Sequence, residues 1–149
     1  MSFFLLTRVN NFVNCNKKMN ILEENNIIKM ESLNALFEHT TEGIIIANQA
    51  GEIVRANPSS QRLFGYTKGE LIGQKIEVLV PNKFKHTHEM HREGYNKKPH
   101  SRSMGKALDL NGKRKNGTEF PIEISLSHYK NENGFFVIAF IIDISERKQ

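Results

Sequence analysis

The alternation of apolar and polar residues near the end of the chain predicts an antiparallel sheet. In residues 122–127 apolar side chains alternate with polar ones, which places the apolar set on one face of a strand. Residues 135–142 are almost all apolar, and many are β-branched or aromatic, so they predict a central strand buried on both faces. Turn sequences containing Asn and Gly stand at 115–118 and 131–134, where the strands reverse. The last third of the chain therefore predicts consecutive antiparallel strands.

The first half of the chain predicts a helix followed by a hairpin. Apolar residues recur at steps of three, four and seven within residues 20–39, which is the helical period. Residues 44–47 and 52–56 are short apolar runs separated by a turn, and they predict two strands. Asn57 then suits a helix N-cap and Pro58 suits the first helical position.

The middle of the chain predicts several short helices before the sheet resumes. Residues 59–64 and 68–72 each end at a glycine, residues 82–95 are charged with a helical pattern, and residues 101–110 lead into a third strand. The predicted order is a helix, two strands, several short helices and three strands, which is typical of an α+β fold. We expect one five-stranded antiparallel sheet, short helices on one of its faces and an N-terminal flanking helix.

Composition narrows the class of protein. At 149 residues with 38% apolar content, the chain can bury one ordinary core. The net charge is +5, but acidic residues are interleaved with the basic ones, which argues against a nucleic-acid partner. The single cysteine, Cys15, rules out an internal disulfide and favours a reducing, cytoplasmic setting.

The amino terminus carries no membrane signal. The apolar run 3–6 is too short for a signal peptide or a bilayer span, so we expect no membrane contact. Residues 1–19 are expected to be a disordered tail, or sequence upstream of a true start at Met19 or Met30. The predicted organisation is a tail and the start of the flanking helix over 1–30, then a domain over 31–144.

Several segments, taken in order, resemble the PAS domain, a sensory module of bacterial sensor histidine kinases. The matching segments are 43–47, 53–58, 64–66 with 70–73, 113–117 and 143–148. The resemblance covers residues 31–149 and implies the PAS fold. It also implies a cytoplasmic sensory or interaction module of two-component signal transduction, which works by a ligand- or partner-dependent conformational shift. The partner it implies is a second copy, another PAS domain or a kinase.

The resemblance also assigns the end of the chain a role. Residues 145–149 would begin a C-terminal signalling helix that is cut short, with Asp143 and Ser145 at the signal exit. Neither catalytic nor kinase motifs occur in the sequence, so we expect no enzymatic activity. We expect the chain to regulate a histidine kinase in trans or to be a fragment of one.

A histidine-rich stretch raises the question of a cofactor. In haem-binding PAS oxygen sensors of the FixL type, the axial histidine follows a comparable proline, and counting back from the 112–118 turn places His88 there. With haem bound in this way, Arg102 would pair with a haem propionate. Met104 is then a candidate for the distal ligand of the iron. Haem is one alternative; another small apolar ligand, including noncovalent flavin, is a second, and the sequence leaves the ligand unknown.

The same stretch does not predict a metal site. His88 and His91 are three residues apart and share a helical face, whereas His86 projects elsewhere. Two imidazoles without a thiolate or a paired carboxylate make an incomplete zinc site. We therefore expect no metal.

Overall fold

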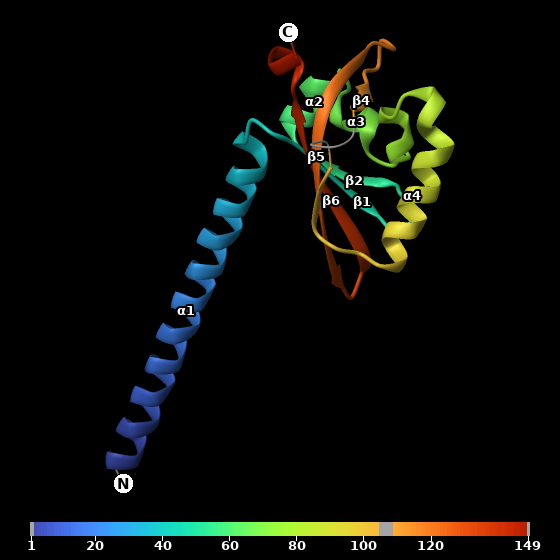
Figure 1. The fold of residues 1–149 in the computed structure, drawn as a ribbon. Helices are drawn as coiled ribbons and strands as arrows, with labels where there is room; N and C mark the ends of the chain where they lie inside the picture. Colours follow the sequence, from blue (N-terminus) through green and yellow to red (C-terminus); the bar gives the residue numbers. More distant parts are fainter. Residues whose placement is uncertain (1, 105–108, 149) are drawn as a thin grey trace. The chain divides into compact units, whose positions relative to one another are not determined.

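The chain divides into two units, residues 1–37 and residues 38–149. The computed structural model describes residues 2–104 and 109–148. The first unit consists of most of helix α1 (Ser2–His39), and the second holds a sheet with shorter helices (Figure 1).

The second unit follows the predicted order of elements. Its strands are β1 (Gly43–Asn48), β2 (Ile53–Ala56), β3 (Arg102–Met104), β4 (Leu110–Lys113), β5 (Glu119–Asn131) and β6 (Gly134–Asp143). Its helices and 3₁₀ turns are α2 (Pro58–Phe64), α3 (Lys68–Leu71), η1 (Ile76–Leu79), η2 (Asn82–Phe84), α4 (Lys85–Lys97) and η3 (Ser145–Lys148).

The sheet is antiparallel, with strand order β2-β1-β6-β5 and an outer position shared by β3 and β4. Arg102 in β3 pairs with Leu126, and Leu110 in β4 pairs with Ile122, so both strands lie along the same edge of β5. The strands therefore occupy five positions, which confirms the predicted five-stranded sheet. β6 is central, as its apolar sequence predicts.

The predicted burial of β6 on both faces was wrong. Apart from the buried Ile141, the residues from 134 to 142 are only half-buried. Val137, Ala139 and Ile141 lie on the face toward the helices, where they line a cavity. Because side chains alternate along a strand, Phe136 and its alternate neighbours lie on the opposite face, away from this cavity.

Helix α1 overturns the expectation of a disordered tail at residues 1–19. The helix is continuous from Ser2 to His39 and runs through the predicted limit between residues 30 and 31. No glycine or proline stands anywhere in this segment, so nothing interrupts the helical hydrogen bonds. Its apolar side chains are spread around the helix and exposed, Phe3 at 85% for example.

The core lies between the sheet and the short helices. The rings of Phe64 in α2 and Phe120 in β5 meet edge to face, with centroids 5.4 Å apart. Gly112 in β4 makes this contact possible, because a Cβ there would stand 2.9 Å from the Phe64 ring. The other buried members of the core are Ile45, Ile53, Ala56, Leu71, Leu79, Ile122 and Ile141.

Asn57 forms the corner between β2 and α2. Its Oδ1 accepts hydrogen bonds from the N–H of Ser60 at 2.9 Å and from the N–H of Ile44 at 2.8 Å. Its Nδ2 donates to the carbonyl of Glu42 at 2.9 Å, and the residue is 0% exposed. The predicted N-cap is confirmed, and the same side chain also fixes the start of β1 to α2.

We predict that Asn57→Ala lowers the free energy of unfolding by about 2–4 kcal/mol. The substitution removes three hydrogen bonds and leaves two N–H groups without their acceptor. Urea unfolding followed by circular dichroism measures the change. Asn133→Ala, in the exposed turn before β6, is the matched control and should change stability by less than about 0.5 kcal/mol. Equal effects of the two substitutions would contradict the corner role of Asn57.

Candidate ligand cavity and exit segment

A cavity of about 430 Å³ lies between the sheet and α4. Its sheet side is lined by alternate residues of the two longest strands, namely Ile122, Ile124 and Leu126 of β5 with Val137, Ala139 and Ile141 of β6. The facing wall is α4, the helix beside the sheet in Figure 1. Cavities of this size and apolar character are typical of small-molecule sites.

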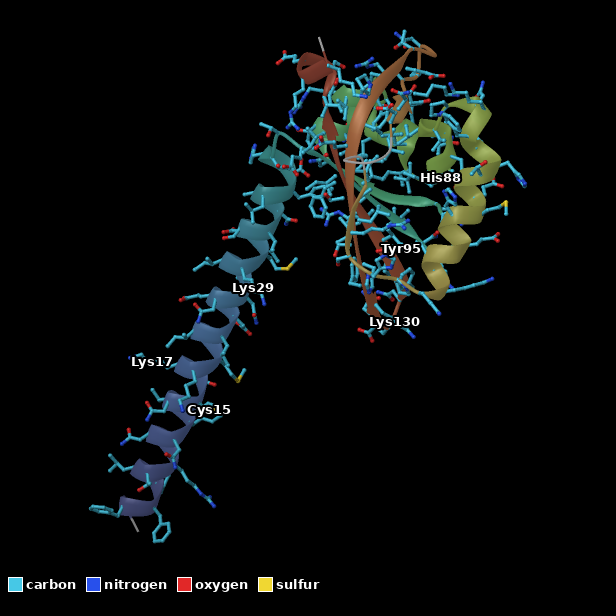
Figure 2. All side chains as sticks on the ribbon, viewed as in Figure 1. Cys15, Lys17, Lys29, His88, Tyr95 and Lys130 are labelled. Atoms are coloured by element: carbon cyan, nitrogen blue, oxygen red, sulfur yellow. The ribbon has the colours of Figure 1, made fainter. Side chains whose placement is uncertain are left out.

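One face of α4 lines the cavity at helical spacing. The contributing residues of this helix are Thr87, His88, His91, Arg92, Tyr95 and Asn96. Figure 2 shows His88 and Tyr95 on the sheet side of the helix. The exposed His86 does not line the cavity, so the predicted division of the three histidines between faces is confirmed.

A buried carboxylate holds α4 in place. Glu77 in η1 is 5% exposed, and its Oε1 lies 2.9 Å from Nδ1 of His88 and 3.0 Å from Nε of Arg92. Its Oε2 has no hydrogen-bond partner among the described residues. An ionised carboxylate only accepts hydrogen bonds, so Nδ1 of His88 is the donor in this contact.

The charge of Glu77 depends on these two partners. Burial raises the pKa of its carboxyl, but the hydrogen bonds from Arg92 and His88 outweigh burial, and the pKa lies below its ordinary value of 4.5. Glu77 therefore remains ionised at neutral pH inside the protein, and a buried anion of this kind requires its cationic partner.

Two further polar contacts hold α4 against the β1–β2 turn. Nδ2 of Asn96 donates to the carbonyl of Gln49 at 2.9 Å, and Arg92 Nη1 approaches the same carbonyl at 3.5 Å. At the end of the helix, the Tyr95 hydroxyl donates to the carbonyl of His100 at 2.8 Å. Polar side chains thus attach α4 to the β1–β2 turn and to the segment that follows the helix.

Arg102 lines the cavity next to Tyr95. Its Cζ is 5.3 Å from the centre of the Tyr95 ring, a cation–π contact. Nε of Arg102 is buried and has no hydrogen-bond partner among the described residues. Burial raises the pKa of Tyr95, and the positive charge of Arg102 acts in the opposite direction.

The exit segment after β6 is organised by Asp143. Its Oδ1 accepts a hydrogen bond from the N–H of Ser145 at 2.8 Å and another from the Ser145 hydroxyl. Its Oδ2 lies 3.2 Å from Nη2 of Arg114. Asp143 therefore holds the first residue of η3 through both its backbone N–H and its hydroxyl.

Arg114 ties the exit segment to the rest of the domain. Besides Asp143, its guanidinium donates from Nε to the carbonyl of Leu63 in α2 at 3.2 Å. It also stacks on Phe120, with Cζ 3.8 Å from the ring centre. A second contact joins the exit to the rim of the cavity, because Nζ of Lys148 lies 2.6 Å from Oδ1 of Asp109, a lining residue whose side chain is 91% exposed.

The structure brings some of the predicted site residues together and leaves others apart. His88 and Arg102 both line the cavity, whereas Asp143 and Ser145 lie at the exit. Met104 pairs with Ile124 in the sheet, but its side chain lies outside the part of the chain that is described. Sequence reasoning missed Glu77, whose only signal was a lone acidic residue inside an apolar run.

Two further classes of site concern residues 2–104 and 109–148. Within these ranges, no cluster of three or more His, Cys, Asp or Glu residues has the proximity that a metal ion needs. None of the helices in the same ranges combines the length and the apolar character needed to cross a lipid bilayer.

Comparisons with known proteins agree with the fold. The family model described as PAS domain matches residues 41–146. The chain is 25% identical to Sensor protein FixL of Bradyrhizobium diazoefficiens over 117 residues, which are 78% of this chain and 23% of that protein. It is also 25% identical to Oxygen sensor protein DosP of Escherichia coli over 108 residues, 72% of this chain and 14% of that protein.

The chain thus spans less than a quarter of the length of these two curated relatives. Among solved structures, the PAS domain of an HTR-like protein from Haloarcula marismortui superposes with a TM-score of 0.67 at 20% identity. That superposition covers 84% of this chain and 99% of the other.

We predict that Glu77→Gln destabilises the protein by about 1.5–3 kcal/mol at pH 7, because it weakens two hydrogen bonds to an ionised group. The folded pKa of Glu77 is depressed, so its stabilisation is complete above pH 4.5 and disappears as the pH falls through the folded pKa. The stability gap between wild type and Glu77→Gln should narrow accordingly in urea titrations from pH 7 to pH 3.

The control is Glu89→Gln, which removes an exposed carboxylate from α4, one residue after His88. It should change stability by less than about 0.5 kcal/mol at every pH. A gap for Glu77→Gln that stays constant with pH would contradict the assignment of an ionised, buried Glu77.

Proposed function

The chain belongs to the PAS domain family, and on that premise we propose that its second unit is a small-molecule sensor of a signal-transduction protein. The single observation that carries the proposal is the cavity of about 430 Å³ between the sheet and α4. Glu77, Arg92 and Asn96 attach α4 to η1 and to the β1–β2 turn, and one face of this helix lines the cavity.

The proposed mechanism is a shift between two populations of the exit segment. A ligand in the cavity contacts α4, the sheet and the wall that contains Asp109. Asp109 is bonded to Lys148, and Asp143 is bonded to Arg114, so a change in the cavity wall can change the stability of η3. The ligand alters the output only as far as it binds the two arrangements with different affinity.

The proposed output is regulation of another protein. The family resemblance supports a histidine kinase of a two-component system as the regulated enzyme, in the cytoplasm, with no catalytic activity in this chain. A homodimer is the proposed assembly, because α1 exposes large apolar side chains such as Phe12 and Ile28 along its length. Light scattering that gives the monomer mass for the full chain would contradict this assembly.

A second candidate function is a haem-based oxygen or redox sensor, favoured by the geometry of His88. The carboxylate of Glu77 engages Nδ1, which orients the ring and leaves Nε2 to coordinate iron. The apolar lining fits a porphyrin face, and Arg102 would pair with a propionate. Haem would supply reversible binding of a diatomic gas. The relative DosP is named as an oxygen sensor protein, which is consistent with this candidate.

For the leading proposal, we predict that the uncharged fluorophore prodan binds the cavity with an increase and blue shift of its emission. Ala139→Phe fills the cavity from β6 and should weaken binding roughly tenfold or more. Ala50→Phe, in the exposed turn between β1 and β2, is the matched control and should bind as the wild type does. Equal affinity of all three proteins would show that the dye binds elsewhere and would contradict the proposal.

For the haem candidate, we predict a Soret band after reconstitution with haem, which shifts on reduction and on addition of CO. His88→Ala should abolish the band, because it removes the only imidazole oriented by Glu77. His86→Ala removes an exposed histidine of the same helix and should leave the band unchanged. A band retained in His88→Ala would refute the ligand assignment, and no band in the wild type would refute haem binding.

A further inference from the structure

The charged residues that line the cavity do not balance one another. They are Arg92, Arg102 and Asp109. Arg92 is paired with Glu77 at 3.0 Å, and Asp109 is paired with Lys148 at 2.6 Å. No ion pair engages Arg102 among the described residues. Among the described residues of the cavity wall, Arg102 thus contributes a positive charge that no ion pair compensates.

The surroundings of Arg102 do little to stabilise its positive charge. Nε is buried without an acceptor, and the side chain is half-buried against the Tyr95 ring. A guanidinium stays protonated at any physiological pH, so the group cannot relieve the cost by losing its proton. A buried cation is stable when an anion or several hydrogen-bond acceptors reach it.

We infer that the cavity binds an amphipathic monocarboxylate, an apolar chain or ring with one carboxylate that pairs with Arg102. This inference rests on the proposed function of the cavity as a ligand site. The forked N–H groups of a guanidinium match the two oxygens of a carboxylate in a bidentate pair. The apolar side chains of β5 and β6 surround the remainder of the ligand.

The lining also sets the charge and the number of polar groups of the ligand. One unpaired cation compensates one negative charge, and the rest of the sheet side is apolar, so a second anionic group would be buried without a partner. An amine of the same length would place a cation beside Arg102 and would be repelled. The site therefore discriminates among ligands of equal apolar size by their head group.

The experiment is competition against prodan with three probes of equal chain length: octanoate, 1-octanol and octylammonium. On the wild type at pH 7, octanoate should displace prodan roughly tenfold or more better than octanol, as charge-assisted hydrogen bonds require. Octylammonium should be the weakest of the three. In Arg102→Gln the preference for octanoate over octanol should fall to about twofold or less, because octanoate loses an ion pair whereas octanol loses at most one hydrogen bond.

Two further variants test whether the effect of Arg102→Gln comes from the loss of its charge. The octanol measurement tests whether the cavity is still formed. Arg102→Lys keeps the positive charge and should retain part of the preference. Arg8→Gln makes the same change of net charge in the exposed part of α1 and should retain all of it. Octanol competition that persists in Arg102→Gln shows that the cavity still binds an apolar chain.

The outcomes distinguish this inference from the proposed function. If octanoate and octanol compete equally on the wild type, or if Arg102→Gln keeps the preference, the carboxylate inference is overturned and the cavity remains a ligand site. Loss of prodan binding in Ala139→Phe tests the ligand site separately, and an unaffected Ala139→Phe overturns both.

Discussion

The buried carboxylate of Glu77 is the constraint on which the arrangement of the second unit depends. An ion that is 5% exposed must find partners, and α4 supplies both of them, through His88 and Arg92. That requirement attaches α4 to η1 and orients the His88 ring. The same helix face lines a cavity of about 430 Å³. The proposed ligand site and a structural ion pair thus share one helix.

The cavity and the exit segment are connected through side chains that belong to both. Asp109 lines the cavity and pairs with Lys148, while Arg114 binds Asp143 and the carbonyl of Leu63. These partly exposed pairs contribute little to stability individually, since solvent screens them. Weak pairs of this kind suit the proposed sensor mechanism. A small difference in ligand affinity between two conformations is enough to shift their populations when the conformations have similar free energies.

Local signals in the sequence were sufficient for most of the fold. The alternation in residues 122–127, the apolar run of β6 and the Asn57-Pro58 corner each predicted the element that the structure contains. The failures occurred where local pattern is silent. The burial of β6 depends on which sheet face other elements pack against, and residues 2–19 are helical although they carry no apolar stripe.

The sequence by itself determined the turns, the caps, the helical face shared by His88 and His91, and the membership in a family whose fold accommodates a central cavity. These features depend on residues within a few positions of one another. Only the tertiary structure decided that Glu77 meets His88 and Arg92, 11 and 15 residues later, and that Asn96 reaches Gln49 across 47 residues. It alone decided that Arg102 lines a cavity without a counter-charge from the described residues. The physical reason is that charge balance and burial depend on all neighbours in space, which no spacing along the chain specifies.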